Sequence, residues 1–453
     1  MTELENTLDE FPKLTLDQAF VLLEQQDYSQ LQLLFEQALP GQLADILEAM
    51  PPKERKKLWD LVPEAQGAET LTFLNDEVRN SLVVEMPTEN LVATAEQMDV
   101  NDLADMIEEL PGHIRQSIEE NLSDEIRECL ETSLSFEEGT AGRLMSLDVI
   151  TVRNDVTLEV VLRYLKLHKD LPDYTDGLMV IDREGFYQGK ILLNKVLTHD
   201  QDTLVKDVMT QNQAILATTD ERNVALFFEQ SHFVSAAVVD ENNLLLGRIT
   251  MDDVIHILRA ESDHALMGRE GLNEEEDLFA PVISSTKRRT VWLGINLVTA
   301  FLAAWVIGLY ADTLEKIVAL AVLMPVVASM GGIAGSQTLT LTIRGLALDQ
   351  ITSGNRSWLV RKEIMIGFIN GLLWALVVAL IAWLWFQDAG ISLIIGAAIV
   401  INLIAAAASG IAIPLILQRL NIDPALSGAV ILTTVTDVVG FMSFLGLATY
   451  FLL

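Results

Sequence analysis

The sequence predicts a multidomain protein with an all-α superhelical domain, a pair of α/β domains and a polytopic α-helical membrane domain of five transmembrane helices. A break in composition is the first reason. Residues 1–286 hold 57 of the 64 acidic residues and 21 of the 30 Lys and Arg, a net charge of −36, whereas 287–453 are mostly apolar and carry +2. Internal repeats are the second reason, because they divide the acidic half into two regions. That half is long enough for about two domains.

The composition also argues against several functions. An acidic surplus disfavours nucleic acid as a partner, since neutralising phosphates requires Lys and Arg. The single Cys129 excludes an intramolecular disulfide and a cysteine metal cluster, and the six His are widely spaced without an HExxH pairing. The first ten residues are acidic and lack the basic flank and apolar core of a signal peptide. No nucleophile–base pair is visible, so we expect no enzyme.

Residues 1–135 are expected to form an acidic helical solenoid. The run LADILEAMP at 43–51, followed by Arg55, recurs as LADMIEELP at 103–111, followed by Arg115. A weaker copy lies around Leu74 and Arg79. Units of this kind bury their apolar sides by stacking on one another.

Residues 136–260 contain a second repeat, in which two apolar strands flank an acidic turn and a helix follows. MVID and QGKI at 179–182 and 188–191 match AVVD and LGRI at 237–240 and 246–249. This arrangement resembles a tandem pair of cystathionine-β-synthase (CBS) domains, which commonly bind adenine nucleotides as regulatory ligands. The resemblance implies that Thr250 and Asp253 contact the ribose of a nucleotide such as ATP. The same two residues also match a capping box that opens the last helix, and both interpretations stay open.

Residues 261–289 are expected to connect this pair to the membrane domain as a plug helix. Asn273 and the glutamates at 274–276 resemble a capped helix start, and Leu278, Phe279 and Val282 give the segment an apolar side. We expect the segment to lie at the membrane surface and to carry movement to the first span.

Residues 290–453 form the predicted membrane domain. Five segments are long enough to cross a ~30 Å apolar core, which takes about 20 helical residues. They are 290–310, 317–343, 364–386, 391–417 and 424–453, and each lacks Lys, Arg, Asp and Glu except for Asp437. Eight basic residues flank one side, and only Lys316 flanks the other. This bias places the acidic half in the cytoplasm and the C-terminus on the periplasmic side of a bacterial inner membrane.

Asp437 is the only charged residue in the last 30 residues of the chain. A carboxylate near the bilayer centre costs roughly 2.5–3.5 kcal/mol on insertion scales and usually marks an ion or proton path. Since no predicted span contains Lys, Arg or His, an ion pair within the membrane has no candidate partner. We interpret Asp437 as the ligand of a hard cation. Two copies in a homodimer would supply two carboxylates, which suits hydrated Mg²⁺.

The second span contains Pro325 and three glycines, which predict a broken helix whose freed carbonyls face a cavity. Ser, Gln and Thr side chains follow directly, and Thr433 and Thr434 precede Asp437 in the fifth span. Small and hydroxyl side chains also suit plain helix packing, so each of them individually has a structural explanation.

The order of domains resembles the MgtE family of bacterial magnesium channels. The most specific matches are MPVVASMGGIAGSQ at 324–337, RGLAL at 344–348 and DPALSGAVILTTVTDVVG at 423–440. The resemblance implies a homodimer in the lipid bilayer that conducts Mg²⁺, with Asp437 holding the hydrated ion and the second and fifth spans lining the pore. The candidate pore residues are Asp437, Gly331, Gly332, Gln337, Thr433, Thr434 and Asp423.

The same resemblance implies gating by cytoplasmic Mg²⁺. Acidic domains that repel one another would compact when Mg²⁺ binds between their carboxylates, and the connector would then close the pore. The expected sensor residues are Asp99, Asp102, Asp105, Asp240, Glu241, Asp252, Glu261 and Asp263.

Two positions depart from the family pattern. Ile333 stands where the family's GGNAG motif has Asn, and Ala429 stands where Pro follows Ser-Gly. Loss of an amide beside the ion site leaves two alternatives open. The same fold would carry another divalent cation, such as Co²⁺ or Mn²⁺, or the protein would be a non-conducting, membrane-anchored sensor of Mg²⁺ or a nucleotide.

Overall fold

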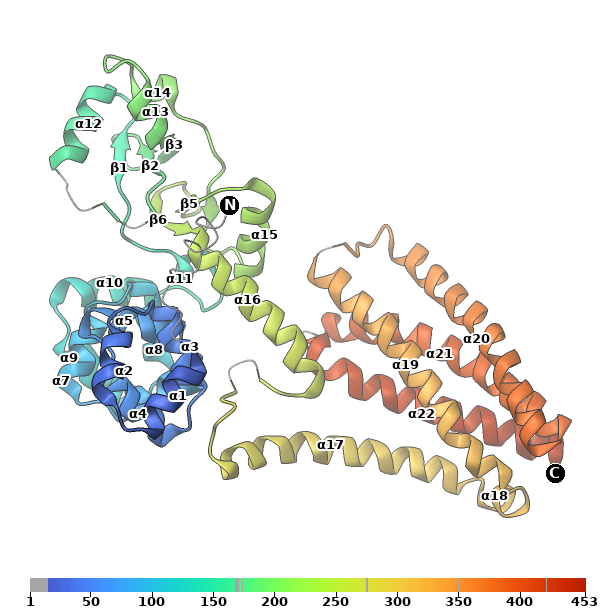
Figure 1. Ribbon diagram of the computed structural model, residues 1–453. Coiled ribbons are helices and arrows are strands. Elements are labelled where there is room, and N and C mark those ends of the chain that lie inside the picture. Colours follow the sequence, from blue (N-terminus) through green and yellow to red (C-terminus); the bar gives the residue numbers. More distant parts are fainter. Residues whose placement is uncertain (1–14, 168–170, 173, 274–275, 349, 421) are drawn as a thin grey trace, which may run out of the picture. The chain divides into compact units, whose positions relative to one another are not determined.

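The computed structural model describes residues 15–453 except 168–170, 173, 274–275, 349 and 421. The chain forms two compact units (Figure 1). The first contains Met1–Ser262 together with Glu275–Ala280, and the second contains Asp263–Glu274 and Pro281–Leu453. Each unit is described by itself.

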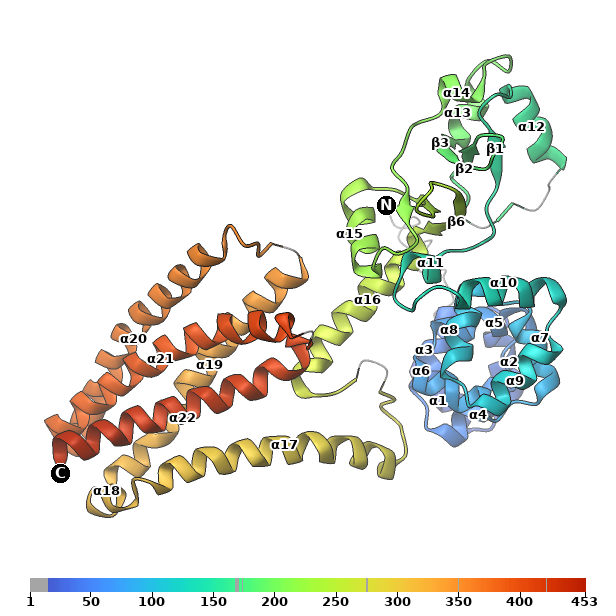
Figure 2. The ribbon, with the colours of Figure 1, turned by 180° about the vertical axis from the view of Figure 1, so that it is seen from behind.

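The N-terminal part of the first unit is the predicted solenoid. Alternate helices contact one another along most of its length, as α3 (Pro40–Glu48) does α5 (Glu64–Phe73) and α8 (Val100–Glu109) does α10 (Asp124–Leu134), so the helices stack and curve together (Figure 2). The repeated Leu of the two LAD motifs, Leu43 and Leu103, is fully buried in the common core. The helices are α1 (Leu16–Glu24), α2 (Tyr28–Phe35), α3 (Pro40–Glu48), α4 (Pro52–Trp59), α5 (Glu64–Phe73), α6 (Asp76–Val83), α7 (Thr88–Ala95), α8 (Val100–Glu109), α9 (Gly112–Asn121) and α10 (Asp124–Leu134).

The rest of the first unit consists of the two predicted α/β repeats. In each sheet the first strand runs parallel to the second, and the second runs antiparallel to the third. Met179 pairs with Lys190 in the first sheet as Ala237 pairs with Arg248 in the second, which confirms the repeat. The elements are α11 (Ala141–Leu144), β1 (Thr151–Arg153), α12 (Leu158–Leu167), β2 (Gly177–Ile181), β3 (Tyr187–Leu192), α13 (Leu193–Thr198), α14 (Val205–Val208), β4 (Ile215–Leu216), α15 (Glu221–Ser231), β5 (Ser235–Val239), β6 (Leu245–Thr250) and α16 (Met251–Met267).

Lys190 joins the two repeats. Its side chain is 3% exposed, and its Nζ lies 2.7 Å from both carboxylate oxygens of Asp176 in the first repeat. The same Nζ donates to the backbone oxygen and the hydroxyl of Ser235 in the second repeat, at 2.9 and 2.7 Å. Burial tends to lower the pKa of this Lys, but its three hydrogens all find acceptors.

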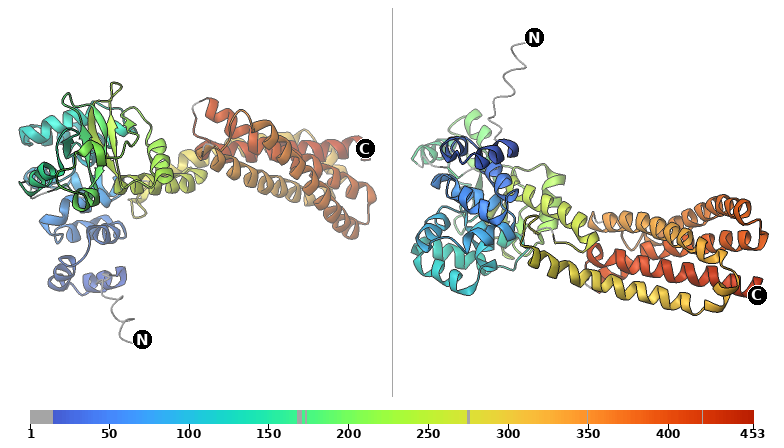
Figure 3. Two further views of the ribbon diagram at one scale, coloured as in Figure 1. Left: turned by 90° about the horizontal axis from the view of Figure 1, so that it is seen from above. Right: turned by 60° about the horizontal axis from the view of Figure 1, so that its bottom comes forward.

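The second unit contains five helices that are long and apolar enough to cross a membrane, counted over the described residues. They are α17 (Val282–Gly308), α19 (Ala319–Ala347), α20 (Arg356–Phe386), α21 (Ala389–Arg419) and α22 (Pro424–Leu452), with the short α18 (Ala311–Lys316) after the first. They lie side by side as a bundle (Figure 3). The helix α21 is the most buried and packs on α19, α20 and α22. The predicted fold class is therefore confirmed.

Two local predictions were wrong. The second span is one continuous helix, α19, because Pro325 lies in its second turn, where only a single helical hydrogen bond is lost. The helix expected to start at Asn273 is absent from the described residues around it, which run as a turn and extended chain from Glu276 to Pro281, while 274–275 lie outside the description. Instead α16 ends at Met267 and a short 3₁₀ turn, η1 (Gly268–Glu270), follows.

Candidate functional site

A polar face of α19 and α22 forms the candidate pore surface. Its cavity of about 330 Å³ is lined by Gly332, Ile333, Ser336, Gln337, Thr340 and Thr433. The five α19 residues recur at intervals of three and four, so they share one side of that helix. Three of the predicted pore residues, Gly332, Gln337 and Thr433, are therefore brought together here. Ile333 lines the same cavity and is 58% exposed.

Asp437 lies one helical turn beyond Thr433 on α22 and so shares its side of the helix. The carboxylate is half-buried, and among the residues that the structure describes it has no hydrogen bond or ion pair. A carboxylate in a membrane helix without a protein partner requires another source of compensating charge. The hydroxyl and amide oxygens of the cavity are of the type that orders the water shell of a hard cation.

A larger cavity of about 650 Å³ shares Ser336 and Thr433 with the pore surface. It extends to Glu270 and Gly271 after α16 and to Trp292 on α17. Gly271 has a φ of +69°, and a Cβ there would lie 2.1 Å from the ring of Trp292, so only glycine fits this turn. Residues 270–272 of the connecting segment thus line a cavity that adjoins the polar face of α19 and α22.

Gly331 faces away from the cavity. A Cβ at this position would lie 2.3 Å from Nδ2 of Asn402 on α21, and a Cβ at Gly440 would lie 2.8 Å from the same atom. Asn402 is 1% exposed, and its Nδ2 donates to the backbone oxygen of Val327 at 2.9 Å. These two glycines therefore let Asn402 pack between α19 and α22.

Thr434 and Asp423 also lie apart from the cavity. The Thr434 hydroxyl donates to the backbone oxygen of Val430 at 2.7 Å. Asp423 is the N-cap of α22, where its carboxylate accepts the amide of Ala425 at 2.7 Å and lies 2.5 Å from Nε2 of His264. Fourteen residues separate it from Asp437, about 21 Å along the helix.

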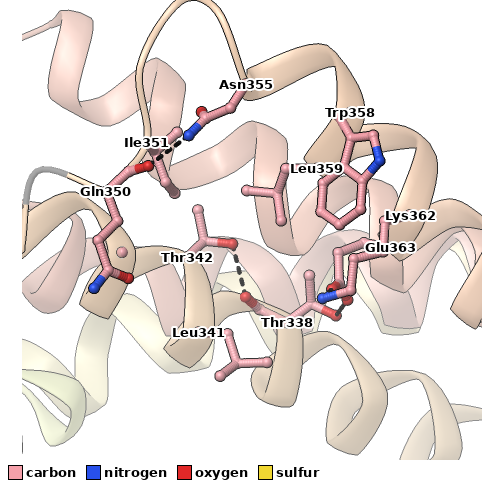
Figure 4. A pocket seen from close by; sticks show the side chains of 11 residues that line it. Thr338, Leu341, Thr342, Gln350, Ile351, Asn355, Trp358, Leu359, Lys362 and Glu363 are labelled. Carbon is pink, nitrogen blue, oxygen red and sulfur yellow. Dashed lines mark hydrogen bonds and ion pairs between the residues drawn. The ribbon is translucent and has the colours of Figure 1, made fainter.

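Another carboxylate of the second unit, which the sequence interpretation missed, is buried. Glu363, the eighth residue of α20, is 5% exposed. Its Oε2 accepts the hydroxyl of Thr338 on α19 at 3.3 Å, and Oε1 lies 3.2 Å from Nζ of Lys362 (Figure 4). A cavity of about 250 Å³ lies between these helix ends and Asn355. The predicted third span began one residue later, so Glu363 was counted as a flank.

Acidic side chains also gather where the solenoid meets the second α/β repeat. Burial, followed by repulsion from Asp99 and Asp253, raises the pKa of Asp102 to about 7. Burial, followed by Asp252 and Asp99, raises the pKa of Asp253 to about 6. Carboxylates of the solenoid and of the second α/β repeat therefore lie close together, and their mutual repulsion costs free energy when they are ionised. Asp253 was predicted only as a nucleotide contact.

Asp105 lies in an adjoining part of the same interface. Its carboxylate accepts Nε of Arg143 at 2.9 Å, yet burial still raises its pKa. It lines a cavity of about 360 Å³ with Arg143, Glu138 and Glu221. Burial, followed by Asp220, raises the pKa of Glu221 as well. Glu138 and Glu221 were not predicted, because only folding brings them beside Asp105.

The remaining predicted sensor residues lie elsewhere. Asp240 and Glu241 occupy the exposed turn before β6, where hydrogen bonds from backbone amides, that of Leu244 first, lower the pKa of Asp240. Glu261 pairs with Arg222, and Asp263 lies near the end of α16. Within the described parts of the chain, no three His, Cys, Asp or Glu side chains are arranged to hold a metal ion.

Thr250 and Asp253 form the capping interaction that the sequence allowed. The amide and hydroxyl of Thr250 donate to Oδ2 of Asp253 at 2.8 and 2.9 Å, directly before α16. The hydroxyl also lies 2.5 Å from Oδ1 of Asp252. The nucleotide contact stays a prediction.

Comparisons with known proteins agree with this architecture. Residues 324–447 match the family model MgtE, described as a divalent cation transporter, 38–139 match the MgtE intracellular N domain, and 205–260 match the CBS domain. The magnesium transporter MgtE of Thermus thermophilus is 28% identical over 90% of this chain and 94% of the relative. That of Bacillus subtilis is 25% identical over 92% and 93%. The crystal structure of the cytosolic domain of the Mg²⁺ channel MgtE in complex with ATP has 27% identity and a TM-score of 0.49, and covers 54% of this chain and 99% of that one.

Proposed function

Because the chain belongs to the MgtE family of divalent cation transporters, we propose that it carries Mg²⁺ across the bacterial inner membrane through a pore between α19 and α22. Asp437 carries the proposal, as a carboxylate that lies in the middle of an apolar helix and has no hydrogen bond or ion pair with any described residue. In the proposed orientation the acidic domains are cytoplasmic and the C-terminus is periplasmic.

The chemistry of the polar face supports Mg²⁺ as cargo. This ion gives up its water reluctantly and is commonly held through water by one or two carboxylates. Asp437 would attract the hydrated ion, and Gln337, Thr340 and Thr433 would accept or donate hydrogen bonds to its water shell. None of the five predicted spans contains a Lys or Arg whose positive charge would compete with the cation for Asp437.

A homodimer would complete the pore. Gln337, Thr340 and Thr433 are exposed in a single copy, and polar side chains facing lipid are costly. A second copy placed against this face would cover them and bring a second Asp437. Two carboxylates would then balance one divalent cation.

The acidic interface supports gating by cytoplasmic Mg²⁺. Burial and the neighbouring Asp99 raise the pKa of both Asp102 and Asp253, so ionising the two carboxyls together costs free energy. Mg²⁺ between these carboxylates would remove the repulsion and favour the compact arrangement, and the connector would carry this change to α17. Since hydrated Mg²⁺ needs only one or two carboxylates, a preformed cage of three ligands is not required.

Another divalent cation is the second candidate, and Ile333 favours it. This side chain occupies the pore surface with an apolar group where the family pattern has an amide, which removes one donor and acceptor from the water shell. Co²⁺ and Mn²⁺ are the alternative cargoes. A non-conducting sensor that binds Mg²⁺ or ATP is the remaining alternative, with Thr250 and Asp253 as its nucleotide contacts.

The test is growth of a bacterium that lacks magnesium uptake, carrying the native chain, Asp437→Ala or Ile333→Asn. We expect rescue by the native chain at low external Mg²⁺ and none by Asp437→Ala. Rescue by Ile333→Asn alone would reject Mg²⁺ as the native cargo. Equal rescue by the native chain and Asp437→Ala would reject the pore assignment.

A further inference from the structure

Arg55 is the largest fully buried side chain of the first unit, and its burial has a structural explanation. Its Nε and Nη2 donate to the backbone oxygens of Leu47 and Met50, each at 3.0 Å, at the C-terminal end of α3. Carbonyls in the last turn of a helix lack the amide partner that the helix interior supplies, although the Leu47 oxygen also accepts the amide of Met50 at 3.2 Å. Arg127 repeats the arrangement, with bonds of 3.0 and 2.6 Å to the backbone oxygens of Glu119 and Leu122. In both repeats the arginine closes the preceding helix.

The two arginines differ in their acidic partner. Arg127 lies 3.3 Å from Asp124, which is on its own helix and 99% exposed. Arg55 reaches Asp277 at 2.9 Å, an aspartate 222 residues away in sequence whose side chain is 4% exposed. Closing α3 does not require this partner. The buried position of Asp277 therefore serves the segment around it, because the ion pair with Arg55 fixes that segment on the solenoid.

That segment is attached to the solenoid at a second point. The backbone amide of Asp277 donates to Oε2 of Glu77 on α6 at 2.8 Å. Oδ1 of Asp277 accepts the amide of Phe279 at 2.8 Å, which folds the segment into a turn. Ser81, also on α6, accepts Nη1 of Arg55 at 3.3 Å and completes the surface.

We propose that Arg55, Glu77 and Ser81 form a docking site on the solenoid for residues 276–280 of the same chain, and that this contact ties the solenoid to the first membrane helix. Pro281 follows the segment directly and caps α17, which begins at Val282. Five residues lead from Asp277 to Val282, and a fully extended chain of that length spans about 18 Å. Movement of the solenoid then pulls on α17 by a route separate from α16. The gating role rests on the proposed function, whereas the docking itself does not.

The docking is tested by hydrogen exchange on the full chain in lipid nanodiscs. We expect the amides of Asp277 and Phe279 to exchange at least about tenfold more slowly than in a free peptide, and Asp277→Asn to abolish this protection. Asp124→Asn is the matched control, because it removes the acidic partner of Arg127 without touching the segment. Unprotected amides in the native chain would reject the docking site. Amides of α3 and α4 report whether Asp277→Asn still folds.

A second variant tests the tie without disturbing the ion pair. Insertion of six Gly and Ser residues between Ala280 and Pro281 lengthens the connection and leaves the docking site intact. We expect the segment to stay protected, while the Mg²⁺ concentration that halves uptake into vesicles rises severalfold. Protection with unchanged inhibition by Mg²⁺ would reject the tie. Absence of any uptake by the native chain would reject the proposed function, and the exchange result would still decide the docking.

Discussion

The burial of Asp102, together with repulsion from Asp99 and Asp253, leads to the most quantitative prediction. Its carboxyl has a pKa of about 7 in the folded protein and 3.8 as its ordinary value. At 1.36 kcal/mol per pKa unit, this difference is worth roughly 4 kcal/mol at most. Because Asp253 titrates nearby and part of the group reaches solvent, we expect about half, roughly 2 kcal/mol.

The direction in which stability changes with pH follows from the number of protons that the folded and unfolded states bind. Between pH 4 and 7 the folded protein holds the Asp102 proton more tightly than the unfolded chain does, so stability falls as the pH rises through this window. Below pH 4 both states are protonated and the penalty is absent. Above pH 7 the penalty is complete. Asp102→Asn, which cannot ionise, is expected to remove it.

The assay is the free energy of local opening of α8, measured by hydrogen exchange on the full chain without Mg²⁺. At pH 8, Asp102→Asn should raise it by roughly 2 kcal/mol, and at pH 4.5 the variant and the native chain should differ little. Mg²⁺ should stabilise the native chain more at pH 8 than at pH 5.5, because protons compete for the same carboxylates. Glu128→Gln, an exposed acid on α10, is the control. A destabilised Asp102→Asn variant, or an unchanged pH profile, would refute the reasoning.

Three further predictions concern packing, the paired domains and the pore surface. Gly331→Ala should abolish uptake, because its Cβ would lie 2.3 Å from Nδ2 of Asn402. The control is Gly308→Ala at the end of α17, whose Cβ would have nothing within 4 Å and which should keep uptake; equal uptake by the two variants would contradict the packing argument. Lys190→Met should lower the unfolding temperature of the CBS pair, at a cost of roughly 2–3 kcal/mol for a broken, mostly buried ion pair, and scanning calorimetry would show no change if the Lys is dispensable. Ile333→Asn should raise Mg²⁺ flux relative to Co²⁺ in vesicles, and an unaltered ratio would exclude this position as a selectivity determinant.

Much of the fold could be predicted because its signals are local. The LAD repeats, the paired strands and the apolar spans each depend on residues close together in sequence, and all three appear in the structure. Asp437 was also predictable, since a single charge in an apolar run needs no knowledge of neighbours. Gly332, Gln337 and Thr433 followed from the resemblance of their segments to the family's motifs.

The contacts that could not be predicted join distant parts of the chain. Asp99 and Asp253 are more than 150 residues apart, and nothing in either segment indicates that folding brings both beside Asp102. Arg55 and Asp277 are farther apart still. The glutamates before Asp277 resembled a helix start, but hydrogen bonds from the solenoid hold the described part of that segment in a turn. Local propensity was overridden there by tertiary contacts.

The central claim is that Asp437 binds the transported ion. The most direct measurement is Mg²⁺ uptake by the purified protein in vesicles with a Mg²⁺-sensitive dye inside, comparing the native chain with Asp437→Asn and Thr434→Val. Asp437→Asn keeps the size of the side chain and removes its charge, while Thr434 only bonds the backbone of its own helix. The account predicts that Asp437→Asn loses nearly all uptake and Thr434→Val keeps it. Native uptake by Asp437→Asn would contradict the account.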